Sequence, residues 1–175
     1  MKYYIVALFD DDSYKCLNPI QRNYSKKFKA NRNSPIPHII LEVIENPNVD
    51  KLDPIIQKIT QPYKKFKVEV DPKVFICEPN KTVSLSIQDK GYIKRFSRLL
   101  ADTLRLHNFS LKSSSAPANI SLANLNYVNK DIKKNDTEFS INAKFETLKV
   151  SRIELWKISN NKRETLIKTY HLKDF

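Results

Sequence analysis

The sequence predicts an α+β fold made of two similar halves. Segments with strand-like alternation or short apolar runs are interleaved with segments whose apolar residues recur at helical spacing. The order of these elements before Gly91 resembles the order after it, and two short strand motifs lie nearly half of the chain apart. The length of 175 residues suits one domain. We therefore expect residues 1–175 to form a single bilobal domain.

The first half is expected to alternate strands and helices. Its elements are a strand over residues 3–9, a basic helix over 20–29, a strand over 38–44, a helix that starts at Asn46-Pro47-Asn48 and ends near Pro62, and strands over 66–77 and 82–88. The first strand is nearly all apolar, which is typical of a central strand. A polar stretch with Pro19 separates it from the basic helix. The last strand alternates strictly, so we expect one buried face and one face exposed to solvent.

The second half begins with the strongest helix signal, over Gly91–His107. Its expected apolar side comprises Ile93, Phe96, Leu99, Leu100, Thr103 and Leu104. A serine-rich loop over 112–117 leads to a strand over 118–122, and residues 129–136 are expected to form another loop. Strands follow over 139–145, 150–156 and 165–172, the last two joined by a turn at Asn160-Asn161, because Asn tolerates positive φ.

Composition restricts the classes of function. The net charge of +12 favours a polyanionic partner such as RNA, although charges on solvated helix faces explain many of the basic residues equally well. The single glycine, Gly91, excludes glycine-rich phosphate loops of the P-loop and dinucleotide-binding types. Cys16 and Cys77 are expected to be reduced thiols, and no Cys-x-x-Cys pair indicates zinc. No apolar run reaches the ~20 residues of a membrane helix. A cytoplasmic location is therefore expected.

Two short strands carry the candidate site. In Pro35–Leu41, side chains alternate between faces, so His38 and Ile40 point one way. In the second stretch, Ala118–Leu122, Asn119 and Ser121 share one face in the same manner. If these faces meet, they line one cleft. The simpler alternative is a histidine at a strand end without any role.

These two stretches resemble the paired signature of the 2H phosphoesterase superfamily, which includes the bacterial 2′-5′ RNA ligase-like proteins. The matching tetrapeptides are His38-Ile39-Ile40-Leu41 and Asn119-Ile120-Ser121-Leu122, and the family pattern is His-x-Thr/Ser-hydrophobic. Supporting matches are Tyr4–Leu8, Leu148–Leu155 and Tyr170-His171-Leu172. The resemblance covers nearly the whole chain. It implies two pseudo-symmetric lobes, each a small antiparallel sheet backed by helices, that face a central cleft.

The resemblance also implies a chemistry, from which this chain departs at two positions. In the family, two histidines act as general base and general acid on a phosphodiester, and the Thr/Ser hydroxyls hold the phosphoryl oxygens. Here His38 is the candidate catalytic residue, and Ser121 and the Asn119 amide are candidates for binding phosphate. Ile40 replaces one hydroxyl, and Asn119 cannot exchange a proton. Loss of one acid–base partner lowers rates by ~10²–10⁴, so catalysis is expected to be weakened or lost, unless His107 or His171 replaces the missing histidine.

Three functions remain open at this point. The first is a metal- and cofactor-independent phosphoesterase that acts on RNA ends or nucleotides with a 2′,3′-cyclic phosphate or a 2′-5′ linkage. The second is a silent relative that binds RNA or a nucleotide in the same cleft, with Tyr3, Tyr4 or Phe9 available to stack on a base. The third is a structural or protein-interaction domain. We expect a monomer with RNA or a nucleotide as its partner.

Overall fold

The computed structural model describes residues 1–30, 34–77, 81–112, 118–125, 138–140 and 146–174. This part of the chain forms three helices: α1 (Asp11–Lys27), α2 (Val49–Thr60) and α3 (Gly91–Leu106). It also forms eight strands: β1 (Lys2–Phe9), β2 (Ile39–Glu45), β3 (Phe66–Cys77), β4 (Thr82–Ile87), β5 (Asn119–Asn124), β6 (Glu138–Ser140), β7 (Thr147–Ile158) and β8 (Glu164–His171). The predicted α+β class is confirmed.

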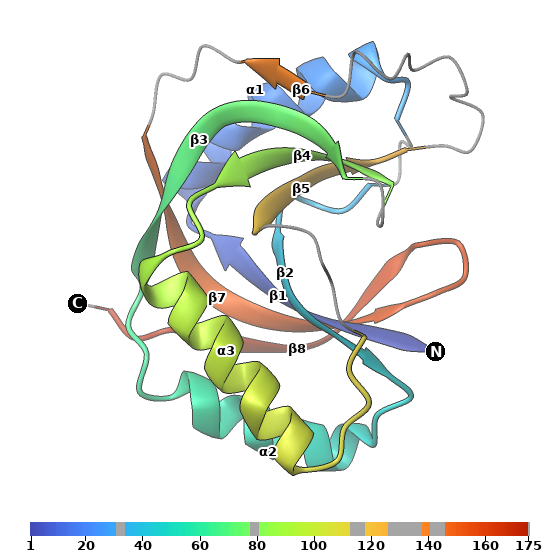
Figure 1. Ribbon diagram of the computed structural model, residues 1–175, viewed down its shortest axis with the longest axis vertical. Coiled ribbons are helices and arrows are strands. Elements are labelled where there is room, and N and C mark those ends of the chain that lie inside the picture. The colour runs from blue at the N-terminus through green and yellow to red at the C-terminus, as the bar shows by residue number, and fades with distance from the viewer. Residues whose placement is uncertain (31–33, 78–80, 113–117, 126–137, 141–145, 175) are drawn as a thin grey trace.

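All strand pairs between these elements are antiparallel, and they form one strongly curved sheet (Figure 1). The strand order is β2-β1-β7-β3-β4-β5, with β8 on β7 and β6 on β3. The long strand β3 belongs to two parts of the sheet, because Phe66–Glu69 pair with β7 whereas Val70–Cys77 pair with β4. The two expected sheets are thus connected through one shared strand.

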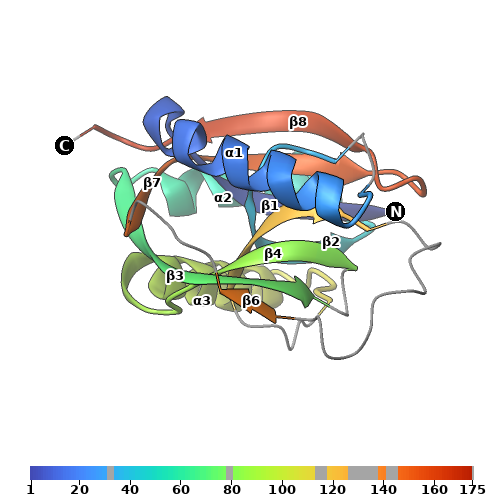
Figure 2. The same cartoon turned by 90° about the horizontal axis from the view of Figure 1, so that it is seen from above.

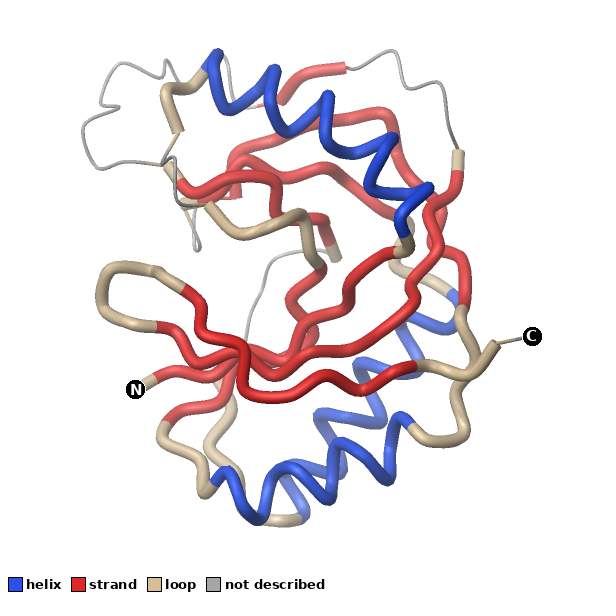
Figure 3. Tube along the Cα trace, turned by 180° about the vertical axis from the view of Figure 1, so that it is seen from behind, coloured by secondary structure: helices blue, strands red, loops and turns tan. Residues whose placement is uncertain are grey.

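Helices cover the two parts of the sheet separately. α2 and α3 lie side by side against the part that contains β1, β2, β7 and β8, while α1 lies against β5 (Figures 1 and 2). Seen from behind, α1 and the α2–α3 pair occupy opposite ends of the molecule (Figure 3). One hydrophobic core joins them, with fully buried members from each helix, such as Leu17, Leu52 and Phe96. The first strand is central, as predicted, since it lies between β2 and β7.

The first helix was predicted to start near residue 20, and this prediction is wrong. α1 starts at Asp11, where the Asp10 side chain accepts a hydrogen bond of 2.9 Å from the Ser13 amide. This cap satisfies a backbone donor, and two acidic residues in the first turn favour the helix dipole. Pro19 lies within the helix with its ring exposed. A proline that normally marks a break is here tolerated in the helix interior.

Three further expectations differ from the structure. The polar face of β4 is largely buried rather than exposed to solvent, since Thr82 is 4% and Ser84 0% exposed. In the β7–β8 turn the residue with positive φ is Lys162, at 59°, rather than Asn160 or Asn161. Leu99 is 43% exposed rather than part of the apolar side of α3.

Some sequence predictions concern parts of the chain that the structure does not describe. The expected loops over 113–117 and 129–136 and the strand residues 141–145 lie outside the described residues. Across the described ranges, no helix is long and apolar enough to cross a membrane.

Candidate functional site

The two motif strands meet at a single point. His38 and Ser121 form an antiparallel bridge in which the His38 amide donates to the Ser121 carbonyl at 3.3 Å and the Ser121 amide donates to the His38 carbonyl at 2.8 Å. Residues that exchange both hydrogen bonds are direct cross-strand neighbours, so their side chains leave the sheet on the same face. The bridge joins β2 and β5, the two ends of the sheet order. The sheet therefore closes on itself at the motif residues.

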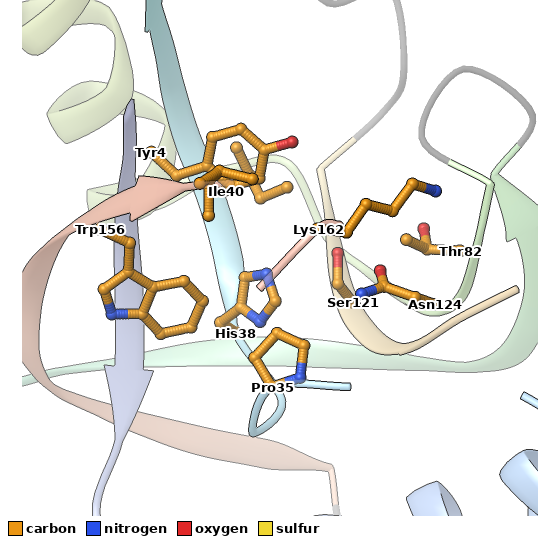
Figure 4. Close-up of a pocket in the computed structure, with 10 residues that line it drawn as sticks. Tyr4, Pro35, His38, Ile40, Thr82, Ser121, Asn124, Trp156 and Lys162 are labelled. Atoms are coloured by element: carbon orange, nitrogen blue, oxygen red, sulfur yellow. The ribbon is translucent and has the colours of Figure 1, made fainter. Parts of the chain in front are cut away.

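Beside this bridge lies a cavity of about 40 Å³ (Figure 4). This volume holds about three water molecules, which is on the scale of the oxygen atoms of one phosphoryl group. Its walls come from β1, β2, β4, β5, β7 and two loops, and its lining residues are Tyr4, Pro35, His38, Ile40, Thr82, Ser121, Asn124, Trp156, Ile158 and Lys162.

The His38 imidazole is buried and oriented. It is 5% exposed, its Nδ1 lies 2.8 Å from the Ile36 carbonyl oxygen, and its ring packs edge-on against Trp156 with centroids 4.7 Å apart. A carbonyl only accepts, so Nδ1 carries the proton and Nε2 holds the free electron pair. Burial lowers the pKa of His38 to about 4, and the hydrogen bond to Ile36 acts in the opposite direction. His38 is therefore neutral at pH 7.

Nε2 of His38 remains accessible from the cavity. The hydrogen bond found for this imidazole is the one at Nδ1, and within the described residues no fully buried side-chain nitrogen or oxygen lacks a partner. Nε2 is therefore in contact with solvent. Figure 4 shows the His38 ring between the side chains of Trp156 and Ser121, with Tyr4 and Ile40 above it in this view. A neutral imidazole with an accessible Nε2 can accept a proton from a bound molecule.

Helix α1 fixes the backbone around the bridge. The Gln21 side-chain amide donates to the carbonyl of Pro35 at 3.2 Å and to that of Leu122 at 2.7 Å, so it connects the two motif segments. The Tyr14 hydroxyl donates to the Pro37 carbonyl at 2.9 Å, next to His38. Burial raises the pKa of Tyr14 to about 12, which keeps this hydroxyl protonated.

A buried carboxylate fixes the aromatic wall of the cavity. The Trp156 indole Nε1 donates to Glu154 at 2.8 Å, and the Arg152 Nε donates to the other oxygen of the same carboxylate at 2.9 Å. Arg152 also donates to the Phe9 carbonyl at 3.0 Å. Glu154 is 8% and Trp156 2% exposed. Trp156 is thereby held against His38 in one orientation.

The opposite wall is polar. Thr82 and Ser121 supply hydroxyls, Asn124 supplies an amide, and Lys162 from the β7–β8 turn supplies a positive charge (Figure 4). The Thr82 hydroxyl also lies 3.0 Å from that of Ser84. None of the ten lining residues is acidic. Donors, a cation and no carboxylate suit a small anion.

The structure brings only part of the predicted set to the cavity. His38, Ile40 and Ser121 line it, whereas Asn119 pairs with Ser86 and is not one of the lining residues. His171 pairs with Arg152 on β8 and does not line it either. Neither does His107, which caps α3 with its Nδ1 2.8 Å from the Thr103 carbonyl.

Only one of the three aromatic residues that were candidates for stacking on a base lies at the cavity. Tyr4 lines the cavity, Tyr3 packs against the core and Phe9 is fully buried. Thus Tyr4 is the one of the three that lines the cavity.

Sequence reasoning did not propose the other six lining residues as part of the site: Pro35, Thr82, Asn124, Trp156, Ile158 and Lys162. Thr82 carried a usable signal, because Thr82, Ser84 and Ser86 form a row of small hydroxyl side chains without any charged residue. Lys162 carried no such signal, because the chain contains many lysines and this one lies in a turn. Among the described residues, no cluster of three His, Cys, Asp or Glu could hold a metal ion.

Comparison with known proteins places the chain by its fold. Neither a scan against protein-family models nor a search of curated proteins finds a match. Among solved structures, TT0787 of Thermus thermophilus has a TM-score of 0.65 at 13% identity, with 99% of each chain covered. LigT of E. coli in its apo form has a TM-score of 0.62 at 11% identity, with 98% of this chain and 97% of LigT covered. A protein described as a phosphoesterase has a TM-score of 0.61 at 10% identity, with 98% of each chain covered.

LigT is also known in complexes with 3′-AMP, ATP, NADP+ and phosphate. At identities this low the likeness is one of fold alone. The chain has the fold of LigT and of the phosphoesterase over nearly its whole length.

Proposed function

We propose that this chain is a 2H phosphoesterase-like protein that binds the phosphate of a nucleotide or an RNA end in the cavity between His38 and Ser121. The ligand class is a 2′,3′-cyclic phosphate or a 2′-5′ linkage, and catalysis is weakened or lost. The observation that carries the proposal is the His38–Ser121 bridge, because it holds both motif side chains at one non-acidic cavity. The fold shared with LigT, whose structures include nucleotide complexes, supports the same ligand class.

His38 has the position of a general base in this proposal. Its Nδ1–H is engaged by the Ile36 carbonyl, so Nε2 accepts a proton from the attacking hydroxyl or water. The Ser121 hydroxyl, the Asn124 amide and Lys162 hold the phosphoryl oxygens. No second histidine lines the cavity to protonate the leaving group. Without that acid, turnover falls by ~10²–10⁴ relative to a two-histidine site.

Bound phosphate changes the protonation of His38. Negative charge beside the imidazole favours the protonated form, so it raises the pKa of His38 from its low value of about 4. Binding is then coupled to proton uptake. We expect affinity for a phosphorylated ligand to increase as the pH falls from 7 towards 5.

The test uses a 2′,3′-cyclic nucleotide and a 2′-5′ dinucleotide with the purified protein, and it measures both binding and turnover. The key variants are His38→Asn, whose amide can still donate to the Ile36 carbonyl, and Ser121→Ala. The matched controls are His171→Gln, on β8, and Ser110→Ala, an exposed serine that does not line the cavity.

The outcomes separate the possible functions. Turnover that is lost in His38→Asn and kept in both controls supports an enzyme. Binding without turnover that both key variants weaken supports a silent binder. Absence of binding and turnover at low salt contradicts the proposal and leaves a structural or protein-interaction role. Turnover that depends on His171 instead would move the acid–base chemistry to β8.

A further inference from the structure

We propose that Lys2 and Lys112 form a second anion-binding site next to the cavity, which takes the phosphate of a neighbouring nucleotide when an oligonucleotide end occupies the cavity at His38 and Ser121. This inference rests on the function proposed above. It narrows the ligand from a nucleotide to a short nucleic-acid strand.

The strand register places Lys2 on the cavity face. Tyr4, which lines the cavity, pairs with Trp156 on one side and with Val43 on the other. Lys2 lies two residues before Tyr4 in the regular part of β1, so both side chains leave the same face. Lys2 also pairs with Ile158, another lining residue.

Lys112 reaches the same face from a separate segment. The Lys112 amide donates to the Val43 carbonyl at 2.9 Å, and Leu111 forms a bridge with Ile44. Leu111 packs against the core, so Lys112, the next residue, points to the opposite face, where Tyr4 lies. A row on this face therefore runs from Lys112 through Val43 to Tyr4.

The two ammonium groups are close enough to disturb each other. The hydrogen-bonding contact with Lys112, and then charge repulsion from it, lower the pKa of Lys2, and burial adds to this. Glu45, the cross-strand neighbour of Lys2, offsets part of the repulsion. Burial raises the pKa of Tyr4 while the charge of Lys112 acts in the opposite direction, which places Lys112 near the cavity rim as well. A phosphate between the two lysines would remove their mutual repulsion and gain two charge-assisted hydrogen bonds.

The spacing suits a neighbouring nucleotide. Val6 pairs with Ile40 at the cavity, and Lys2 lies four residues earlier on β1, a distance of about 13 Å along a strand. One phosphate is too small to reach both places. Tyr4 lies between them with its ring partly exposed, which leaves it available to stack on a base. The order along β1 is thus a phosphate at His38, a base at Tyr4 and a further phosphate at Lys2 and Lys112.

The experiment compares two ligands, adenosine 2′,3′-cyclic phosphate and a trinucleotide that ends in the same cyclic phosphate. The variant is Lys2→Gln/Lys112→Gln. The matched control is Lys51→Gln/Lys58→Gln, which removes the same charge from exposed positions of α2. We expect the wild type to bind the trinucleotide more tightly than the mononucleotide. The variant should lose about tenfold in trinucleotide affinity with mononucleotide affinity unchanged. Its salt dependence should fall by about 0.7 in the slope of log K against log salt.

Each other result overturns the inference in a distinct way. Full trinucleotide affinity in Lys2→Gln/Lys112→Gln removes the second site but leaves the proposed function, because the mononucleotide still binds. An equal loss in the α2 control shows an effect of net charge and not of a site. Binding of neither ligand by the wild type contradicts both the second site and the proposed function.

Discussion

Nδ1 of His38 donates its proton to the Ile36 carbonyl, so the chemistry of the imidazole depends on Nε2. The same burial that orients the ring also makes it a pH-dependent element of stability. In the unfolded chain a histidine has a pKa of about 6.5, whereas in the fold burial lowers the pKa of His38 to about 4. Between these values the unfolded state binds more protons, so stability decreases as the pH falls.

We predict that this loss amounts to about 2–3 kcal/mol of unfolding free energy between pH 7 and pH 4.5. Burial raises the pKa of Glu42 to about 6, and this group acts in the opposite direction, because its contribution is present at low pH and is lost as the pH rises through 6. The measurement is therefore a difference: urea unfolding of wild type and His38→Asn at several pH values. His38→Asn should not show this decrease in unfolding free energy at low pH. If both proteins had the same pH dependence of stability, the fold would not lower the pKa of His38.

Glu154 is a second residue with a sharp expected effect. It accepts from Trp156 and Arg152 at 2.8 and 2.9 Å inside a buried wall, so Glu154→Ala leaves the indole N–H and the Arg152 Nε–H without their acceptor. We predict a loss of about 3 kcal/mol in unfolding free energy. Urea unfolding, monitored through the fluorescence of Trp156, measures this loss. Glu164→Ala on β8 is the control, with an expected change within about 0.5 kcal/mol; a similar small change in Glu154→Ala would mean that the carboxylate does not hold the indole.

At the scale of single residues, the sequence predicted the part of the site that lies on alternating strands. His38 and Ser121 were placed on the cavity side because a strand has a fixed period. Asn119 follows the same period as Ser121, and its pairing with Ser86 is in regular register with the pairing of Ser121 and Ser84, yet it does not line the cavity. How far a cavity extends along a strand depends on tertiary packing, and the pattern of side chains along the strand does not reveal it.

At the scale of elements, α1 connects the two motif segments through hydrogen bonds. The Gln21 amide donates to carbonyls on both sides of the His38–Ser121 bridge. We predict that Gln21→Ala lowers the unfolding free energy by about 1–2 kcal/mol, because two carbonyls lose their donor. It should also speed hydrogen exchange of the Ser121 amide, which donates across the bridge.

The control for Gln21→Ala is Asn23→Ala, at an exposed position on the same helix. It should leave both the stability and the Ser121 exchange rate nearly unchanged. Gln21→Glu keeps the size of the side chain but replaces its donors with an anion facing two carbonyls, and it should weaken the bridge more than alanine does. Unchanged exchange at Ser121 in both Gln21 variants would show that the bridge holds without α1.

The sequence predicted the bounds of helices that have a regular apolar period. It did not predict a helix start that depends on a capping side chain, or the burial of a strand face that depends on tertiary packing. The apolar spacing of α2 and α3 matched their helices closely. The start of α1 was missed because the stretch that contains Pro19 was expected to be non-helical, whereas the Asp10 cap starts the helix at Asp11. The alternation of β4 is real, but alternation indicates only that two faces differ in polarity. Whether the polar face meets water depends on what packs above it, and here the hydroxyls of Thr82 and Ser84 are enclosed.

For the whole molecule, the sequence predicted the α+β class, but not how the two parts of the sheet are assembled. Each part combines strands from before and after Gly91. β3 continues from one part into the other, and β2 and β5 meet at the bridge although they are at opposite ends of the strand order. Both features depend on contacts between residues far apart in sequence, which no local pattern encodes. They explain why the candidate site forms where the sheet closes.

The shared strand and core have a consequence for folding. The expectation of one bilobal domain stays a prediction, and β3 gives it a physical basis. Separating the two parts of the sheet would break the pairing of Phe66–Glu69 with β7 and open a core that draws on all three helices. We therefore predict a single cooperative unfolding transition. The test follows Trp156 fluorescence, which reports on β7, together with far-ultraviolet circular dichroism and hydrogen exchange of β5 amides. Coincident midpoints are expected, and Val74→Ala, in the core of β3, should shift all three together. Separate midpoints, or a shift confined to one probe, would mean that the two parts of the sheet unfold independently.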